Sequence, residues 1–336
     1  MLVAFESADE LARTLPGLAR EVGPDDEVVV VDNGSTSSPA PVIAEHLPAA
    51  RLIELGENAG FTVATNRGAA ETTGEIVLML NPDALPEPGF GEAIRRPYAE
   101  CPEWGAWMGL VACHIGVEKV VNSWENPVHF TGIAWAGGHG RPLAEVDGPR
   151  EIATGSGAAL AVRREVWEEA GGLAEHFFLY HEDVDLSLRI RSAGHRIGFE
   201  PSAIVDHDYE FGANERKWFW LERNRLATVI RTYPGALLWP LAPALLATEI
   251  VLLLVAARQG WLGAKLGAYR DLFRWLPRLG RERREIRAAR RIGPREFADQ
   301  LTPDLDSDLI PDFARRGIVR TLLRAYWQAV KALLPG

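Results

Sequence analysis

The first 100 residues alternate between short apolar runs and helical patterns. Runs at 2–5, 28–31 and 76–80 are apolar at consecutive positions, as in strands buried on both faces, and the run at 52–55 also predicts a strand. Helical patterns separate them at 8–18, 41–47 and 61–73, the first beginning with the capping-box spacing of Ser7 and Glu10. Alternating strands and helices predict a mainly parallel sheet covered on both faces.

Residues 101–160 are rich in glycine and tryptophan and indicate short strands and loops. A helical pattern returns at 163–170. The apolar positions from 184 to 190 alternate, which favours a strand, but acids at 182–185 and arginines near the end favour a helix aligned with its dipole. We expect a helix there, a last strand at 199–205, and helices from Glu215 onward.

Polar clusters follow the predicted strands, where ligands of such sheets bind. The clusters are Glu6-Ser7, Asp32–Ser35, 57–60 and Asn81-Pro82-Asp83. Asp32 can accept hydrogen bonds from a base or ribose, although Asn-Gly-Ser is also ordinary turn chemistry. Asp83 can hold Mg²⁺ or Mn²⁺ against a diphosphate, with His207 as a second ligand, because hard cations prefer carboxylate and phosphate oxygens. A turn and a core histidine are the alternatives.

Three carboxylates, Glu182, Asp183 and Asp185, lie within four residues at the start of a predicted helix. The helix dipole stabilises ionised acids there, and an ionised carboxylate can act as general base on a hydroxyl. Helix capping with solvated neighbours is the alternative. Upstream, the glycines of 155–157 would let the backbone approach a ligand closely.

Composition sets limits on the class of protein. The chain has 336 residues, 47% hydrophobic and 24% charged, which is an ordinary globular composition. Its formal net charge of -10 argues against nucleic-acid binding, which needs a basic face. Two cysteines, Cys101 and Cys113, are too few to stabilise a chain of this length through disulfides, and they predict reduced thiols of a cytosolic protein.

The charge is unevenly distributed. Residues 1–257 hold 19 basic and 37 acidic residues, whereas 258–295 hold 12 and 3. An apolar stretch at 235–257, with Glu249 as its one charge and two prolines, precedes the basic block. We expect residues 235–295 to contact a membrane surface, as a peripheral or monotopic helix rather than a span. A buried core helix followed by a solvated basic helix is the alternative.

An ordered set of motifs resembles the family 2 glycosyltransferases, in particular their bacterial rhamnosyltransferase-like members. The motifs are Val31–Ser35, 57–61 with Asn66, Leu80–Asp83, Gly155–Gly157 with Arg163-Arg164, 178–186, and Glu222–Arg225. The resemblance covers about residues 1–233. It implies a GT-A type α/β fold, with a nucleotide-sugar-binding half at 1–100, an acceptor-binding and catalytic half at 101–212, and a helical region at 213–336.

The resemblance also implies a nucleotide-diphosphate sugar donor, a divalent metal (Mg²⁺ or Mn²⁺), and a single displacement that inverts the anomeric carbon. It implies Asp183 as general base and Asp83 with His207 as metal ligands, although Asn81 replaces the first acid of the family's Asp-x-Asp motif. The residues expected to bind the nucleotide sugar are Phe5, Glu6, Asp32, Asn33, Gly34, Ser35, Asn58, Phe61, Asn66, Asn81 and Asp83. Those expected to contact the acceptor are Gly155, Ser156, Gly157, Tyr180, Glu182 and Trp135.

Our leading hypothesis is an inverting glycosyltransferase at the cytoplasmic face of the membrane. It would extend a lipid-linked glycan or another cell-envelope acceptor, with dTDP-rhamnose as the first candidate donor and galactose, mannose and glucose open. One alternative is an inactive nucleotide-sugar-binding partner subunit, against which the intact Asp83 and Asp183 argue. Another is a nucleotidyltransferase, which would need a glycine-rich basic loop that residues 6–15 lack.

Overall fold

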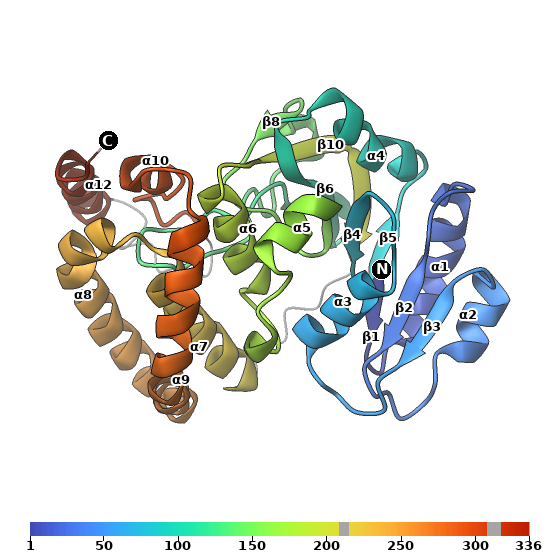
Figure 1. Cartoon of the computed structure of the whole chain (residues 1–336), viewed down its shortest axis with the longest axis horizontal. Helices are drawn as coiled ribbons and strands as arrows, with labels where there is room; N and C mark the ends of the chain where they lie inside the picture. The colour runs from blue at the N-terminus through green and yellow to red at the C-terminus, as the bar shows by residue number, and fades with distance from the viewer. Residues whose placement is uncertain (208–214, 308–316, 336) are drawn as a thin grey trace. The chain divides into compact units, whose positions relative to one another are not determined.

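The computed structural model describes residues 1–207, 215–307 and 317–335 (Figure 1). The chain forms two compact units. The first comprises Met1–Asn126, Ala136–Ile190 and His195–Glu210, and the second comprises Pro127–Trp135, Arg191–Gly194 and Phe211–Gly336. Most of the predicted segments 1–100 and 101–212 therefore lies in one unit, and each unit is described by itself below.

The first unit begins with a parallel three-stranded sheet, in which β2 lies between β1 and β3. Its strands and the helices that alternate with them are β1 (Leu2–Ala4), α1 (Ala8–Glu21), β2 (Val29–Asp32), α2 (Ala40–His46), β3 (Arg51–Glu54) and α3 (Phe61–Ala70). All the elements predicted here are present, with small shifts in their bounds. The capping box is wrong, because the Ser7 hydroxyl accepts the Phe5 N–H at 3.1 Å and makes no cap bond.

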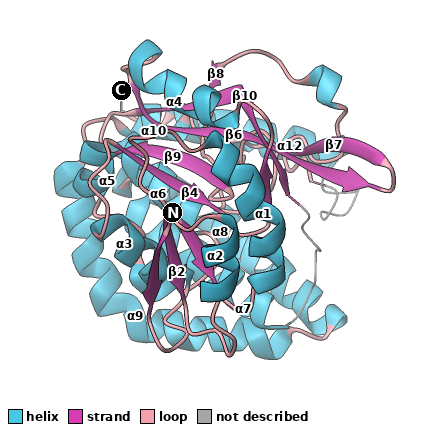
Figure 2. Cartoon of the chain, turned by 90° about the vertical axis from the view of Figure 1, so that its right-hand side faces the viewer, coloured by secondary structure: helices cyan, strands magenta, loops and turns pink. Residues whose placement is uncertain are grey.

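A larger, seven-stranded sheet completes the first unit, in the order β4-β9-β6-β10-β5, with β7 on β6 and β8 on β10 (Figure 2). Its strands are β4 (Ile76–Leu80), β5 (Ala84–Pro86), β6 (Trp104–Ile115), β7 (Glu118–Ser123), β8 (Arg150–Glu151), β9 (Ala159–Arg163) and β10 (Arg196–His207). Of these pairs only β6 with β10 is parallel. The parallel arrangement we predicted thus describes the first sheet, whereas the larger one is mixed. A tight turn between β6 and β7, for example, can join only antiparallel neighbours.

Met1 connects the two sheets. Its amino group donates to the Leu78 carbonyl at 2.8 Å, and its carbonyl accepts the Leu80 N–H at 3.1 Å. This is the hydrogen-bond pattern of a parallel ladder, in which one residue bonds to two that flank its partner. Because β1 runs parallel to both β2 and β4, the carboxyl ends of these three strands lie along the same edge.

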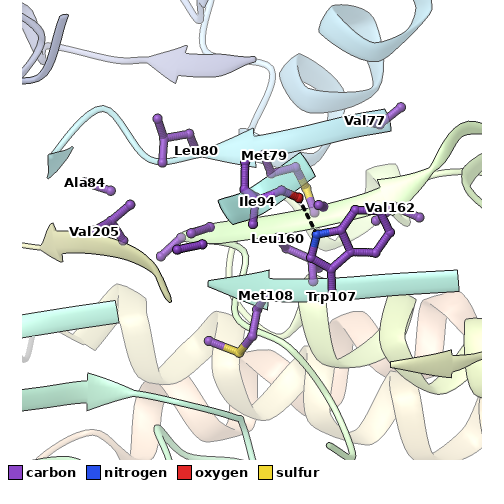
Figure 3. Close-up of a cluster of buried hydrophobic side chains, with 14 of the residues drawn as sticks. Val77, Met79, Leu80, Ala84, Ile94, Trp107, Met108, Leu160, Val162 and Val205 are labelled. Atoms are coloured by element: carbon purple, nitrogen blue, oxygen red, sulfur yellow. Dashed lines mark hydrogen bonds between the residues drawn. The ribbon is translucent and has the colours of Figure 1, made fainter. Parts of the chain in front are cut away.

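The core of the first unit lies between the larger sheet and its helices, α4 (Phe90–Glu100), α5 (Arg164–Ala170) and α6 (Glu182–Ser192). Trp107 of β6 is fully buried, and its indole N–H donates to the Ile94 carbonyl of α4 at 2.7 Å (Figure 3). Burying a large aromatic side chain with its polar atom satisfied contributes strongly to stability. The helix predicted after residue 181 is confirmed as α6.

From Glu215 onward the described part of the second unit is mostly helical, as predicted. Its long helices are α7 (Glu215–Thr232), α8 (Gly235–Gln259), α9 (Leu262–Ala289) and α12 (Gly317–Ala332), with a short α10 (Pro294–Ala298). Glu249 of α8 bonds to Arg225 of α7 and to Lys265 of α9. Glu222 of α7 also pairs with both cations, so a buried cluster of charges joins the three helices.

Candidate functional site

The ends of β1 and β2 are tied together by side chains that we expected to bind a nucleotide. Glu6 has a left-handed backbone (φ 53°), and its carboxylate accepts the N–H and hydroxyl of Thr36 at 2.8 and 2.7 Å. These hydrogen bonds lower the pKa of Glu6. Asp32 is buried and accepts the Ser35 N–H at 3.0 Å. Phe5, 47% exposed, presents an apolar ring at this edge.

Two asparagines and a glycine fix the loop after β3 against the end of β2. The Asn33 side-chain nitrogen donates to Asn58 Oδ1 at 3.0 Å, and Asn33 Oδ1 accepts the Ala59 N–H at 2.9 Å. Gly34 has φ +82°, and a Cβ there would lie 2.4 Å from the backbone of Glu57, so only glycine fits. Asn33, Gly34 and Asn58 therefore shape this edge of the sheet.

Helix α3 holds the segment that leads into α6. The Asn66 amide donates to the Leu173 carbonyl at 2.9 Å and accepts the Leu173 N–H at 2.8 Å. The Thr62 N–H donates to the Phe178 carbonyl at 3.3 Å. Phe61, which begins α3, is half-buried. Of the residues expected beneath the donor sugar, Asn66 thus fastens α3 to the loop at Leu173.

The backbone immediately before α6 is strained. Phe178, Tyr180 and His181 have positive φ angles of 68°, 67° and 67°. Such conformations cost free energy in residues with a Cβ and persist only where the surroundings impose them. The Thr62 N–H bond to the Phe178 carbonyl holds the first of these residues, and the loop leads to Asp183 in the first turn of α6.

Asp83 and His207 lie side by side, as the metal-site prediction requires. The Asp83 carboxylate is 3.2 Å from His207 Nε2, and the Asn81 side-chain nitrogen lies 3.2 Å from the same Nε2. The register of β10 on β5, with His207 opposite Ala84, brings them together. Burial would raise the pKa of Asp83, but the hydrogen bond and charge of His207 outweigh it, so this pKa is lowered.

The side chains of Asp83 and His207 fit a divalent cation whose other ligands do not come from the protein. Within residues 1–207, 215–307 and 317–335, no three His, Cys, Asp or Glu side chains gather around one point. A carboxylate and an imidazole suit Mn²⁺, and Mg²⁺ commonly binds with few protein ligands plus phosphate oxygens. Asp83 and His207 could therefore hold a metal whose remaining ligands are diphosphate oxygens and water.

Asp183 accepts hydrogen bonds on both carboxylate oxygens. Oδ2 accepts the Gly157 N–H at 3.1 Å and the Asn126 side-chain amide at 3.2 Å, and Oδ1 accepts the Val184 N–H at 2.7 Å. Burial raises the pKa of Asp183, whereas the N–H groups of Gly157 and Val184 oppose that rise by favouring the charged form.

Glu182 precedes Asp183 and lies in a contrasting environment. It is buried, and its Oε2 has no hydrogen-bond partner among the described residues. Burial and the charge of Asp183 raise its pKa to about 8. Two adjacent carboxyls, Glu182 buried and Asp183 partly buried, resist carrying two charges, and Asp183 has the N–H donors, so Asp183 is the one that ionises first.

The predicted glycine segment takes part in this arrangement through its backbone. Gly157 supplies an N–H to Asp183, and the Ser156 N–H lies 3.4 Å from the Met108 sulfur. A Cβ on Gly155 would lie 2.7 Å from the buried Leu160 side chain, which would have to move to accept a larger residue there. Trp135, expected to contact the acceptor, belongs to the second unit.

Asn126 is a site residue that our sequence reasoning missed. It lies three residues beyond the end of β7 and contacts Asp183 directly. A signal was present, since it is a polar residue just after a strand end. Because the chain between 101 and 160 has no clear periodicity, the sequence did not reveal that strand.

Comparisons with known proteins agree on one family. The family model described as Glycosyl transferase family 2 matches residues 1–169. The N-acetylglucosaminyl-diphospho-decaprenol L-rhamnosyltransferase of Mycobacterium tuberculosis is 28% identical over 229 residues, covering 61% of this chain and 74% of that protein. The O-antigen biosynthesis protein RfbC of Myxococcus xanthus is 30% identical over 210 residues, covering 59% of this chain and 16% of that protein.

A solved structure supports the fold. The crystal structure of GalNAc-T7 with UDP, GalNAc and Mn²⁺ matches with a TM-score of 0.58 at 15% identity, covering 70% of this chain and 47% of that one. At this identity the likeness concerns the fold alone, and it agrees with the predicted GT-A type. The family model matches half of the chain, and this protein therefore belongs to glycosyltransferase family 2.

Proposed function

We propose that this glycosyltransferase moves a sugar, with rhamnose from dTDP-rhamnose as the first candidate, to a hydroxyl of a lipid-linked cell-envelope glycan. The observation that carries the proposal is the Asp183 carboxylate, which accepts three N–H groups in the same unit that pairs Asp83 with His207. The sugar and the acceptor class rest on the names of the mycobacterial and Myxococcus relatives.

The chemistry needs a base and a stabilised leaving group. Asp183 would take the proton of the acceptor hydroxyl as that oxygen forms a bond to the anomeric carbon. The bond between this carbon and the diphosphate breaks in the same step, so the diphosphate leaves with the electron pair and the configuration inverts. A divalent cation bound by Asp83 and His207 would supply Lewis-acid chemistry toward the negative diphosphate. The GalNAc-T7 structure was solved with Mn²⁺, which supports our proposal that the bound cation is divalent.

Membrane attachment is part of the proposal. Among the described helices, α8 alone is long and apolar enough to cross a bilayer. Trp239, Leu246 and Leu254 on α8 are 83%, 64% and 58% exposed, whereas Glu249 is tied to Arg225 and Lys265. A set of exposed apolar side chains on a helix whose charge is paired within the protein forms a surface that a lipid bilayer could cover.

We place this surface at the cytoplasmic face of the membrane. The arginines of 258–295 would meet anionic lipid there, and a nucleotide-sugar donor is supplied from the cytoplasm. The mycobacterial relative, by its name, acts on a decaprenol-linked substrate, which fits the same position.

A transfer assay tests the proposal. The full chain is incubated with dTDP-rhamnose, N-acetylglucosaminyl-diphospho-decaprenol and Mn²⁺, and the lipid product is analysed by mass spectrometry and by NMR of the anomeric configuration. We expect a product with one added deoxyhexose and inverted configuration. No transfer and no donor hydrolysis with dTDP-, UDP- or GDP-sugars would contradict the enzymatic proposal, and transfer of another sugar would correct the donor.

A further inference from the structure

Both the nitrogen and the oxygen of the Asn126 side-chain amide have hydrogen-bond partners, and one of these partners is Asp183. Its nitrogen donates to Asp183 Oδ2 at 3.2 Å and lies 3.4 Å from the Gly155 carbonyl, while its oxygen lies 3.2 Å from the Ser123 hydroxyl. Since the nitrogen lies between two acceptors, Asp183 Oδ2 and the Gly155 carbonyl, the neighbours determine which way the amide faces.

The backbone of Asn126 is held as firmly as its side chain. The Asn126 N–H donates to the Thr154 carbonyl at 2.9 Å, and the Thr154 hydroxyl donates to the Asn126 carbonyl. The preceding turn is anchored too, because the Gly137 N–H donates to the Glu125 carbonyl at 2.8 Å. A residue fixed at every polar atom is a rigid support for whatever it contacts.

We propose that Asn126 is a positioning residue for the reaction: with the Gly157 N–H it occupies Asp183 Oδ2 and leaves Oδ1 as the oxygen that receives the acceptor proton. Oδ2 accepts two N–H groups, which use both of its lone pairs, whereas from other described residues Oδ1 accepts only the Val184 N–H. The inference rests on the proposed role of Asp183 as base.

Charged neighbours make this support important. Glu182 and Asp185 lie on the same turn of α6 as Asp183, and the charges of Glu182 and Asp183 disfavour each other. Asp185 is neutralised by Arg189 at 2.8 Å, and the charge of His181 favours ionised Asp183. The carboxylate must stay ionised to act as base, and each N–H donor on it favours that state.

Two substitutions at Asn126 separate positioning from mere space filling. Asn126→Ala removes the donor, and we expect kcat to fall about 10- to 100-fold with the KM for dTDP-rhamnose little changed. Asn126→Asp keeps the shape but replaces the donor with a like charge, so we expect a larger loss. In both variants the acidic limb of the kcat pH profile should move to higher pH. Asn122→Ala on β7, beside Cys113, is the matched control and should change neither kcat nor its pH profile.

A second measurement does not depend on the substrates. The carbon-13 carboxyl signal of Asp183, assigned with Asp183→Asn, is titrated by NMR in the wild type and the Asn126 variants. We expect the midpoint to rise in Asn126→Ala and further in Asn126→Asp. An unchanged midpoint, or full activity in Asn126→Asp, would overturn the inference. Absence of transfer in the wild type would contradict the proposed function, while the NMR titration would still decide the role of Asn126.

Discussion

The backbone N–H of Asn81 donates to the carbonyl of Ala158 at 3.1 Å. Asn81 is two residues before Asp83, and Ala158 directly follows Gly157, whose N–H holds Asp183. One hydrogen bond therefore joins the strand end that carries the proposed metal ligand to the segment that orients the proposed base. This link fixes the relation between the two carboxylates through backbone atoms, which substitution of side chains leaves in place.

Replacing the proposed base should separate catalysis from binding. Asp183→Asn removes the proton acceptor, and we expect transfer from dTDP-rhamnose to fall by about 10²- to 10⁴-fold. Donor binding should persist, because the donor-side residues Glu6 and Asp32 do not contact Asp183. Transfer assays and a thermal-shift titration with dTDP-rhamnose measure the two quantities. Wild-type transfer in the variant would rule out Asp183 as base.

The buried Glu182 should make folding stability depend on pH. Its pKa is about 8 in the folded protein, above the ordinary value of 4.5, so the native state holds a proton that the unfolded state has released. Stability is therefore greatest below pH 4.5 for this group and falls as the pH rises toward 8, by up to about 1.4 kcal/mol per pH unit.

Glu182→Gln should remove this decline. Urea unfolding at pH 5, 6, 7 and 8 measures it, and we expect a flatter dependence than in the wild type. Glu168→Gln on α5, at an exposed position, is the matched control and should keep the wild-type slope. An identical slope in Glu182→Gln would show that Glu182 is ionised throughout this range.

The metal proposal predicts a specific effect of His207. His207→Ala leaves Asp83 as the one ligand of the pair, so Mn²⁺ binding in the presence of dTDP should weaken by about tenfold or more. Isothermal titration calorimetry with MnCl₂ measures the affinity. His114→Ala on β6, a half-exposed histidine next to Asp206, is the control. Equal affinities in the three proteins would exclude His207 as a ligand.

The charge cluster of the second unit should be sensitive to loss of one member. Lys265 is fully buried and bonds to both Glu222 and Glu249. Lys265→Met would leave the carboxylates of Glu222 and Glu249 with only Arg225 from this cluster, which should lower the free energy of unfolding by about 3–5 kcal/mol. Urea denaturation measures it. Arg270→Met, on the exposed face of α9, should change it by less than about 0.5 kcal/mol, and similar values for both would contradict the cluster's importance.

The exposed face of α8 should be needed for membrane binding. Trp239→Glu combined with Leu254→Glu places charges where we propose lipid contact, and we expect sedimentation with phosphatidylglycerol vesicles to be lost. Val117→Glu, at a fully exposed apolar residue of the first unit, should bind vesicles like the wild type. Binding by the double variant at wild-type level would refute this surface as the attachment site.

Local sequence patterns were sufficient wherever neighbours along the chain decide the structure. The β-branched residues 28–31 predicted β2, and acids before 186 with arginines after it predicted α6, because strand burial and the helix dipole act within a few residues. Even there, tertiary contacts overrode one local rule. The Ser7 hydroxyl serves the Phe5 N–H instead of capping α1.

The candidate site shows the same division. The sequence by itself determined the identity and order of Asp83, Asp183 and His207, and with them the family resemblance. Only the tertiary structure decided that His207 meets Asp83, that Asn126 supports Asp183, and that Glu249 is paired. These contacts depend on strand register and on loops from distant parts of the chain, and neither leaves a periodic signal in the residues that make them.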